Sequence, residues 1–217
     1  MTSQTFLVFG ATGQTGQHFT SLALREGHTV RALARNPSKF GYEHPALEVH
    51  TGTVTDIPDP DLDELVRGVD YVVSMLGDVE AQKTRKVNTE FVRRLVPAMR
   101  RQGVKRFLYQ AGGLSKAPGQ PLPPALWAVR KTLARSYNGQ HEDNEAVMQY
   151  LTDEASDIEW MVHRAGIGSN GPSKGVLQRS SRAISIATFI DCAAYTYRTV
   201  MDPSAVHTCD PSAYRKP

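Results

Sequence analysis

Three glycines at intervals of three residues give the clearest chemical signal in this chain. Gly10, Gly13 and Gly16 follow the apolar run Phe6–Phe9 and precede a helical pattern. A strand, a glycine turn and a helix N-terminus direct backbone N–H groups and the positive end of the helix dipole toward an anion. The first glycine allows the turn, the second lets a pyrophosphate approach, and the third lets the helix lie close to the sheet. The pattern predicts a dinucleotide site formed by Gly10, Ala11, Thr12, Gly13, Gln14, Thr15 and Gly16.

The end of the second predicted strand bears on which dinucleotide is bound. An NAD site usually has an acid about 20 residues beyond the glycines, where it accepts a hydrogen bond from the ribose. This chain has Arg35 and Lys39 in that region and no acid at the end of the strand. Because a guanidinium pairs with two phosphate oxygens at once, we predict NADP(H) as the cofactor. Arg31 can compete for this role from the middle of the strand, and the alternative is a basic surface without a ligand.

A polar cluster at 141–145 is where we look for a catalytic acid. His141 has a side chain that ordinarily titrates near neutrality, Asp143 can orient it or bind a substrate hydroxyl, and Asn144 can donate to a carbonyl. The competing interpretation is a set of helix caps, since polar residues are common at helix N-termini. The other histidines are scattered without ligand spacing, so no metal site is predicted.

Strand and helix patterns alternate along the chain and must position these residues. They predict an α/β fold, a single Rossmann-type doubly wound parallel sheet with helices on both faces, in one domain over 1–217. The substrate side is expected at about 112–145 and 165–182. Within it, Leu126, Val129 and Leu133 recur at helical spacing, and the helix that carries them is expected either to pack through this apolar stripe or to cover a site. The tail is expected to be irregular. The expected strands are 6–9, 29–34, 47–50, 71–75, 106–109, 158–163 and a short one at 183–186, and the expected helices are 14–26, 61–67, 84–102, 125–136, 142–152 and 189–201.

Composition excludes several other classes of protein. The 217 residues carry a net charge of +3, and no apolar run approaches the ~20 residues that span a bilayer. Cys192 and Cys209 are too few for a disulfide framework, and no signal segment precedes the first strand. We therefore expect a cytoplasmic protein that binds a small-molecule substrate, without nucleic acid or membrane, as a monomer or homodimer. One basic cluster is expected to be a solvated helix face: Arg93, Arg94, Arg100, Arg101, Lys105 and Arg106.

Several motifs together resemble a known family. The run Gly10–Gly16, the segment Gly27–Pro37, Asn88 before Gly103–Phe107, and Asp157–Gly166 are similar to the atypical short-chain dehydrogenases/reductases. The members most similar in size are the biliverdin reductase B or flavin reductase type and the NmrA-like NAD(P)H-binding proteins. The resemblance implies that Arg35 binds the 2′-phosphate. It also implies cofactor contacts from Thr53 and Val54 beside the adenine, from Met75, Leu76 and Gly77 on the ribose and nicotinamide side, and from Gln110, Ala111 and Gly112 under the nicotinamide.

The catalytic side departs from this family. The expected serine after the fifth strand is missing, although Ser115 follows nearby, and the Tyr-x-x-x-Lys positions fall on Gln140 and Asn144. A flavin, quinone or enone acceptor spreads charge over a conjugated system, so water can supply its proton. The first hypothesis is therefore an NADPH-dependent reductase of such an acceptor. The alternatives are a non-catalytic NADP(H)-binding redox sensor and a reductase or isomerase of a natural-product pathway.

Overall fold

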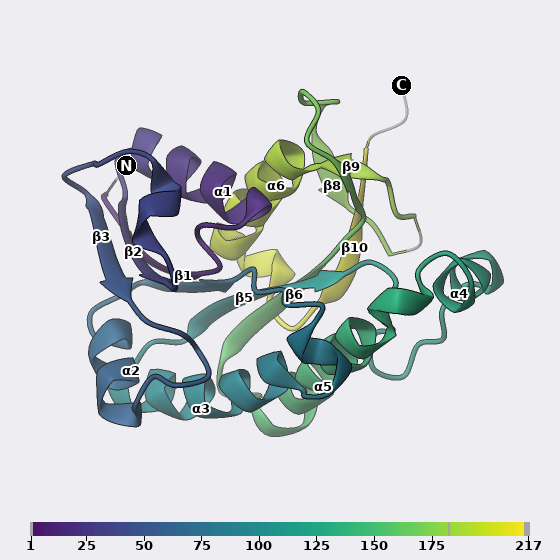
Figure 1. Cartoon of the computed structure of the whole chain (residues 1–217), viewed down its shortest axis with the longest axis horizontal. Helices are drawn as coiled ribbons and strands as arrows, with labels where there is room; N and C mark the ends of the chain where they lie inside the picture. Colours follow the sequence, from purple (N-terminus) through teal and green to yellow (C-terminus); the bar gives the residue numbers. More distant parts are fainter. Residues whose placement is uncertain (1, 182, 215–217) are drawn as a thin grey trace.

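A computed structural model describes residues 2–181 and 183–214, and Figure 1 shows a central sheet covered by helices on both faces. The predicted α/β, doubly wound fold is confirmed. Met1, Arg182 and residues 215–217, which fall in the predicted domain, substrate-side segment and tail, lie outside this description. In spatial order, the eight-stranded sheet contains β3 (Leu47–Thr51), β2 (Thr29–Ala34), β1 (Thr5–Phe9), β4 (Tyr71–Ser74), β5 (Arg106–Gly112), β6 (Glu159–Ala165), β10 (Cys209–Tyr214) and β8 (Leu177–Arg179).

Two layers of helices cover the sheet because each presents an apolar stripe to it. On one face α1 (Gln14–Arg25) packs beside α6 (Phe189–Met201), and Phe19 of α1 meets Phe6 of β1 edge to face. The opposite face is covered by α2 (Asp59–Val66), α3 (Val87–Gln102) and α5 (Asn138–Glu154), as Figure 1 shows. Thr188 caps α6, since its side chain accepts from the Asp191 N–H.

The order of the strands creates the position of the site. β1 lies between β2 and β4, and all three run parallel. The chain therefore adds β2 and β3 on one side of β1 and then crosses over to add β4 on its other side. A crevice forms at the carboxyl ends of the strands at such a switch point, and ligands bind there in open α/β sheets. The glycine turn after β1 and the segments after β2 and β4 meet at this crevice.

The C-terminal region departs from the expectations. Residues 183–186 are not a strand; β9 (Ala187–Thr188) follows them and pairs with β7 (Ile167–Ser169) in a separate two-stranded sheet. The expectation of an irregular tail was wrong, because β10 runs parallel to β6 and then antiparallel to β8. Pro211 lies where the pairing passes from β6 to β8, a place where a strand tolerates a missing N–H.

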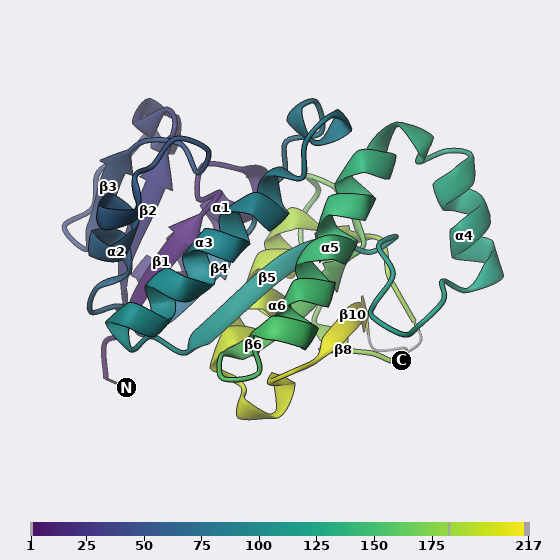
Figure 2. The same ribbon diagram turned by 90° about the horizontal axis from the view of Figure 1, so that it is seen from below.

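The helix α4 (Pro124–Lys131) was predicted as 125–136, either packed on the body or covering a site. Figure 2 shows it projecting beyond α5 at one end of the molecule. Trp127 and Leu133 are 55% and 85% exposed, whereas Arg130 is buried. Arg130 forms an ion pair with Glu145 of α5 and donates to the Leu114 carbonyl. A charged contact rather than the predicted apolar stripe therefore attaches α4 to α5.

The basic cluster on α3 forms ion pairs with both neighbouring helices. Arg94 and Arg101 bind acids of α2, and Arg93 binds Glu154 at the end of α5. Arg100 binds Asp157 just beyond that helix. These side chains are partly exposed, so they lie on a solvated face with acids interspersed. No helix among residues 2–181 and 183–214 is both long and apolar enough to cross a membrane.

Candidate functional site

A cleft of about 340 Å³ lies at the switch point, over the carboxyl ends of β1, β2, β3 and β4. Residues from five separate segments line it, and most were predicted from the sequence to bind a cofactor. The predicted residues that line the cleft are Gly10, Thr12, Gly13, Arg35, Lys39, Thr53, Val54, Met75, Leu76 and Gly77. The structure thus brings together the glycine turn, the basic end of β2 and the segment after β4.

The glycine turn leaves room for an anion at the N-terminus of α1. Gly10 has a φ of +82°, and a Cβ there would lie 2.6 Å from the Met75 carbonyl oxygen. A Cβ on Gly16 would lie 2.0 Å from the Gly10 carbonyl oxygen, so α1 could not pack as closely. Gly13 is the N-cap residue, and no side chain in the described part of the chain caps this helix. These features fit the pyrophosphate of a dinucleotide, which backbone N–H groups would hold.

The other predicted glycine-loop residues lie beside the cleft rather than in its lining. Ala11, Thr15 and Gly16 are buried, and they support the turn from below. Gln14 is exposed and donates to the Asn170 side chain, 3.3 Å away in the segment after β7. Gln14 therefore links the start of α1 to the predicted substrate-side region.

Arg35 at the other end of the cleft has an acidic neighbour that the sequence did not reveal. Its guanidinium Nη1 lies 3.1 Å from Oδ2 of Asp78, a residue that follows β4. Lys39 also lines the cleft, and Thr53 holds Thr55 through a hydroxyl contact of 2.9 Å. Arg31 has a different role: it binds Glu48 and donates to the Leu65 carbonyl. The competition that Arg31 posed for the phosphate is thereby removed.

Asp143 caps a neighbouring helix and lies away from the cleft. It is fully buried, and its carboxylate accepts from the backbone N–H groups of Asn88 and Thr89 in the first turn of α3. The Thr89 hydroxyl and the Gln82 amide complete the shell at 2.7 and 2.8 Å. Acids at helix N-termini stabilise the dipole, and α3 has no side-chain cap of its own. The structure therefore shows Asp143 capping α3, and a catalytic role for it stays a prediction.

A buried hydrogen-bond chain connects the cleft wall to His141. Asn88 lines the cleft and donates to the Tyr109 hydroxyl at 2.8 Å, and Tyr109 donates to Oδ1 of Asn144 at 2.6 Å. The Asn144 amide then donates to Ser115 at 3.2 Å, whose hydroxyl lies 3.4 Å from Nδ1 of His141. Two amides interrupt this chain, so it fixes side-chain positions and is a poor path for protons.

The expectation that His141 titrates near neutrality was wrong. Burial and the nearby Arg130 lower the pKa of His141 to about 4. Its ring is therefore neutral at physiological pH and has no acidic proton to give. Its Nε2 is buried and has no hydrogen-bond partner among residues 2–181 and 183–214. His141 thus contacts Ser115 behind the cleft wall, and its catalytic role stays a prediction.

Gln140 and Asn144, which stand where the family carries a tyrosine and a lysine, lie close to two glycines of the predicted cofactor site. The Gln140 amide nitrogen would lie 3.0 Å from a Cβ on Gly77, so Gln140 packs over a glycine of the cleft. Asn144 and His141 lie beside Gly112. Gln110 points to the opposite face of the sheet, where it accepts from Thr196, and Ala111 is buried in the α3–α5 core. Of the three residues predicted to lie under the nicotinamide, Gly112 is the one beside His141 and Asn144.

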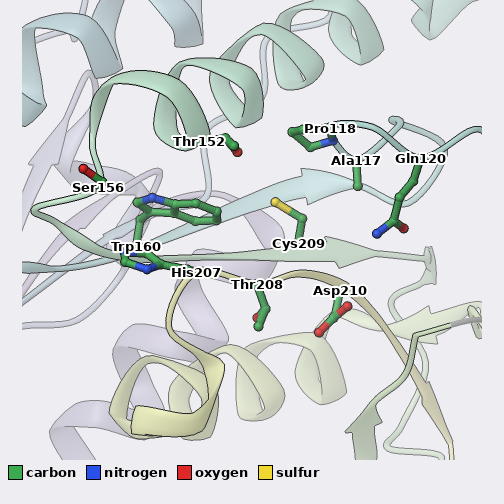
Figure 3. Close-up of a pocket in the computed structure, with 10 residues that line it drawn as sticks. All are labelled: Ala117, Pro118, Gln120, Thr152, Ser156, Trp160, His207, Thr208, Cys209 and Asp210. Carbon is green, nitrogen blue, oxygen red and sulfur yellow. The ribbon is translucent and has the colours of Figure 1, made fainter.

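A separate hollow of about 480 Å³ lies between β6, β10 and the end of α5 (Figure 3). Trp160 and Cys209 line it, and none of the predicted site residues does. Burial raises the pKa of the Cys209 thiol to about 12, so the thiol is not a nucleophile at neutral pH. Within the described residues, no group of three or more His, Cys, Asp or Glu side chains is arranged to hold a metal ion.

Sequence reasoning missed functional neighbours that only the tertiary fold brings to the cleft. Asp78 lines it and Tyr109 lies behind its wall, whereas Asn88 and Ser115 were noted in the sequence only as part of a family motif and as a nearby serine. One signal was available for Asp78: it directly follows the glycine that ends the β4 segment. Tyr109 carried none, since a tyrosine in a buried strand is ordinarily a packing residue.

Comparison with known proteins identifies the protein family. The pattern of the NAD(P)H-binding family matches residues 10–189. A 3 beta-hydroxysteroid dehydrogenase/Delta 5→4-isomerase of Mycobacterium tuberculosis is 32% identical over 181 residues, which are 76% of this chain and 47% of that protein. This chain thus spans about half the length of that relative.

Two solved structures share the fold over almost the whole chain. The anaerobillin reductase ChuY of Escherichia coli O157:H7 has a TM-score of 0.76 at 18% identity, covering 98% of this chain and 99% of that one. A short-chain dehydrogenase/reductase of Veillonella parvula has a TM-score of 0.75 at 17% identity, covering 100% and 99%. At these identities, the likeness concerns the fold.

Proposed function

We propose that this chain, which belongs to the NAD(P)H-binding family, is an NADPH-dependent oxidoreductase. In this proposal it transfers a hydride to a small conjugated acceptor of the flavin, quinone or enone type. One observation carries the proposal: a single cleft joins the uncapped N-terminus of α1 to Arg35 and Lys39. These groups suit the two phosphate-bearing parts of NADPH, a pyrophosphate at one end and a 2′-phosphate at the other.

The catalytic side supports an acceptor that needs no protein acid. Gln140 and Asn144 stand at the positions of the family's tyrosine and lysine, and His141 is neutral and buried. A bound nicotinamide cofactor supplies the hydride. The chain's own residues would then orient the two rings and exclude water, while solvent supplies the proton to the delocalised product. Two similar proteins, a hydroxysteroid dehydrogenase and an anaerobillin reductase, have redox activities, which supports an oxidoreductase function.

The test is NADPH oxidation with a panel of free flavins, quinones and cyclic enones, followed by absorbance of the reduced cofactor. We expect steady turnover with at least one member. Arg35→Gln is expected to raise the KM for NADPH more than that for NADH, because only NADPH carries the 2′-phosphate. Binding of NADPH without oxidation by any member of the panel would refute the reductase proposal.

A second candidate is a non-catalytic NADP(H) sensor, favoured by the exposed apolar side chains of the α4 region. Trp127, Leu133 and Tyr137 are all largely exposed there, which suits contact with a partner protein. A sensor must bind NADP⁺ and NADPH with unequal affinities, since a ligand shifts only an equilibrium whose states it distinguishes. Titration calorimetry with both forms separates this candidate: equal affinities exclude it.

A further inference from the structure

Asp78 places a negative charge where the proposed function puts the 2′-phosphate. Its Oδ2 lies 3.1 Å from Nη1 of Arg35, and both side chains line the same cleft. Among the described residues that line this cleft, Asp78 is the only carboxylate. The ion pair crosses the crevice from the end of β2 to the segment after β4. The end of β2 has no acid of its own, but Asp78 from the segment after β4 places a carboxylate beside it.

Local hydrogen bonds hold the Asp78 carboxylate in this position. Its Oδ1 accepts from the Ala81 N–H at 3.1 Å, and its own N–H donates to Oε1 of Gln82 at 3.1 Å. The Gln82 amide binds Asp143, the cap of α3. One carboxylate oxygen is thus used to fix the turn, while the other faces Arg35. Asp78 is an anchored charge rather than a mobile surface acid.

We propose, resting on the proposed function, that Asp78 is a specificity-determining residue that sets the ratio of NADPH to NADH affinity. A 2′-phosphate gains the Arg35 guanidinium but must displace Asp78 from it and then lies beside a like charge. A free 2′-hydroxyl can instead donate to the Asp78 carboxylate, as it does to an acid at the end of β2 in NAD-binding proteins. Arg35 would thus bind the 2′-phosphate of NADPH, and Asp78 would bind the 2′-hydroxyl of NADH.

The experiment measures dissociation constants of two fragments that differ by one phosphate, 2′,5′-ADP and 5′-AMP, by titration calorimetry. The main variant is Asp78→Asn, which removes the charge and keeps an oxygen for the Ala81 N–H. We expect Asp78→Asn to bind 2′,5′-ADP more tightly and 5′-AMP more weakly than the wild-type protein does. The ratio of the two affinities should then change by roughly tenfold. Arg35→Gln is expected to shift the ratio in the opposite direction.

The matched control is Glu80→Gln, which removes the same charge from the same segment. Glu80 binds Lys83 and does not line the cleft, so the ratio of 2′,5′-ADP to 5′-AMP affinity in Glu80→Gln should stay at the wild-type value. Thermal melting of each variant checks that the fold is retained. A ratio unchanged in Asp78→Asn, or changed equally in Glu80→Gln, overturns the inference. If the wild-type protein binds neither NADPH nor NADH, the proposed function itself fails, which is a separate result.

Discussion

Replacing Asp143 by asparagine separates a capping role from a catalytic one. The wild-type carboxylate is buried and accepts four hydrogen bonds, from Gln82, the Asn88 N–H, and the N–H and hydroxyl of Thr89. In Asp143→Asn, an NH₂ group replaces one acceptor oxygen and faces donors. The backbone N–H groups at the start of α3 then lose part of their cap.

The expected cost follows from the donors left without an acceptor. Two of the four donors face the new NH₂ group, and a buried unsatisfied donor costs about 1–3 kcal/mol. We therefore expect Asp143→Asn to lower the free energy of unfolding by about 3 kcal/mol, a large part of a typical 5–15 kcal/mol total. For a chain of this length, the melting temperature should fall by about 6–12 °C.

Urea denaturation and NADPH oxidation should be measured on the same preparations. The control is Asp153→Asn, an acid on the same helix whose contact with Gln149 is exposed, and it should change stability little. Below its melting temperature, Asp143→Asn should keep most of the wild-type kcat. Wild-type stability combined with a large loss of kcat would refute the capping assignment and restore Asp143 as a catalytic residue.

Three further changes test other parts of the structure. Gly16→Ala should weaken NADPH binding by roughly tenfold or more, because its Cβ would push α1 off the turn, whereas Gly171→Ala, whose Cβ would make only an ordinary 3.6 Å contact with the Ser169 Oγ, should bind normally in the same titration. The pKa of His141 is lowered in the folded state from 6.5 to about 4, so stability is full above pH 6.5 and falls as the pH drops toward 4. Urea midpoints should show this slope, with His141→Gln reducing it. The part that remains includes His163, whose pKa is lowered to about 3, and the paired or hydrogen-bonded acids whose pKa is also lowered: Glu48, Asp63, Asp157, Asp191 and Asp202. Arg130→Met should break the contact between α4 and α5 and accelerate chymotryptic cleavage within α4, and an unchanged cleavage rate would contradict the anchoring role.

Local patterns predicted most of the sheet and its helices, because the signals lie within single segments. The strand–turn–helix unit around Gly10 is an example, since four apolar residues and three glycines suffice to specify it. β10 could not be predicted in this way. Its sequence contains Asp210 and Pro211 and lacks alternation, and pairing with β6 and β8 is what makes it a strand. Tertiary pairing there overrides a weak intrinsic preference.

Charge contacts misled the interpretation of α4 and of the 141–145 cluster. The spacing of apolar residues in α4 predicted a buried stripe, yet Arg130 is the buried side chain, satisfied by Glu145. Asp143 sits in an acidic, polar run that reads equally well as a cap or as a catalytic group. What decides between them is the position of the α3 N-terminus, which lies more than 50 residues earlier in the chain. No local pattern contains that information.

The same argument bears on how cofactor preference is judged from sequence. The usual rule examines the residue that ends β2, and here it finds Arg35 and no acid. In the fold, β1 separates β2 from β4, and both strands end at the same crevice. A residue of the segment after β4 can therefore reach the same end of the cleft, and here it is Asp78, four residues beyond the strand. Because the charge at that end is the sum of both contributions, an arginine after β2 favours the 2′-phosphate only to the extent that the segment after β4 leaves the guanidinium free.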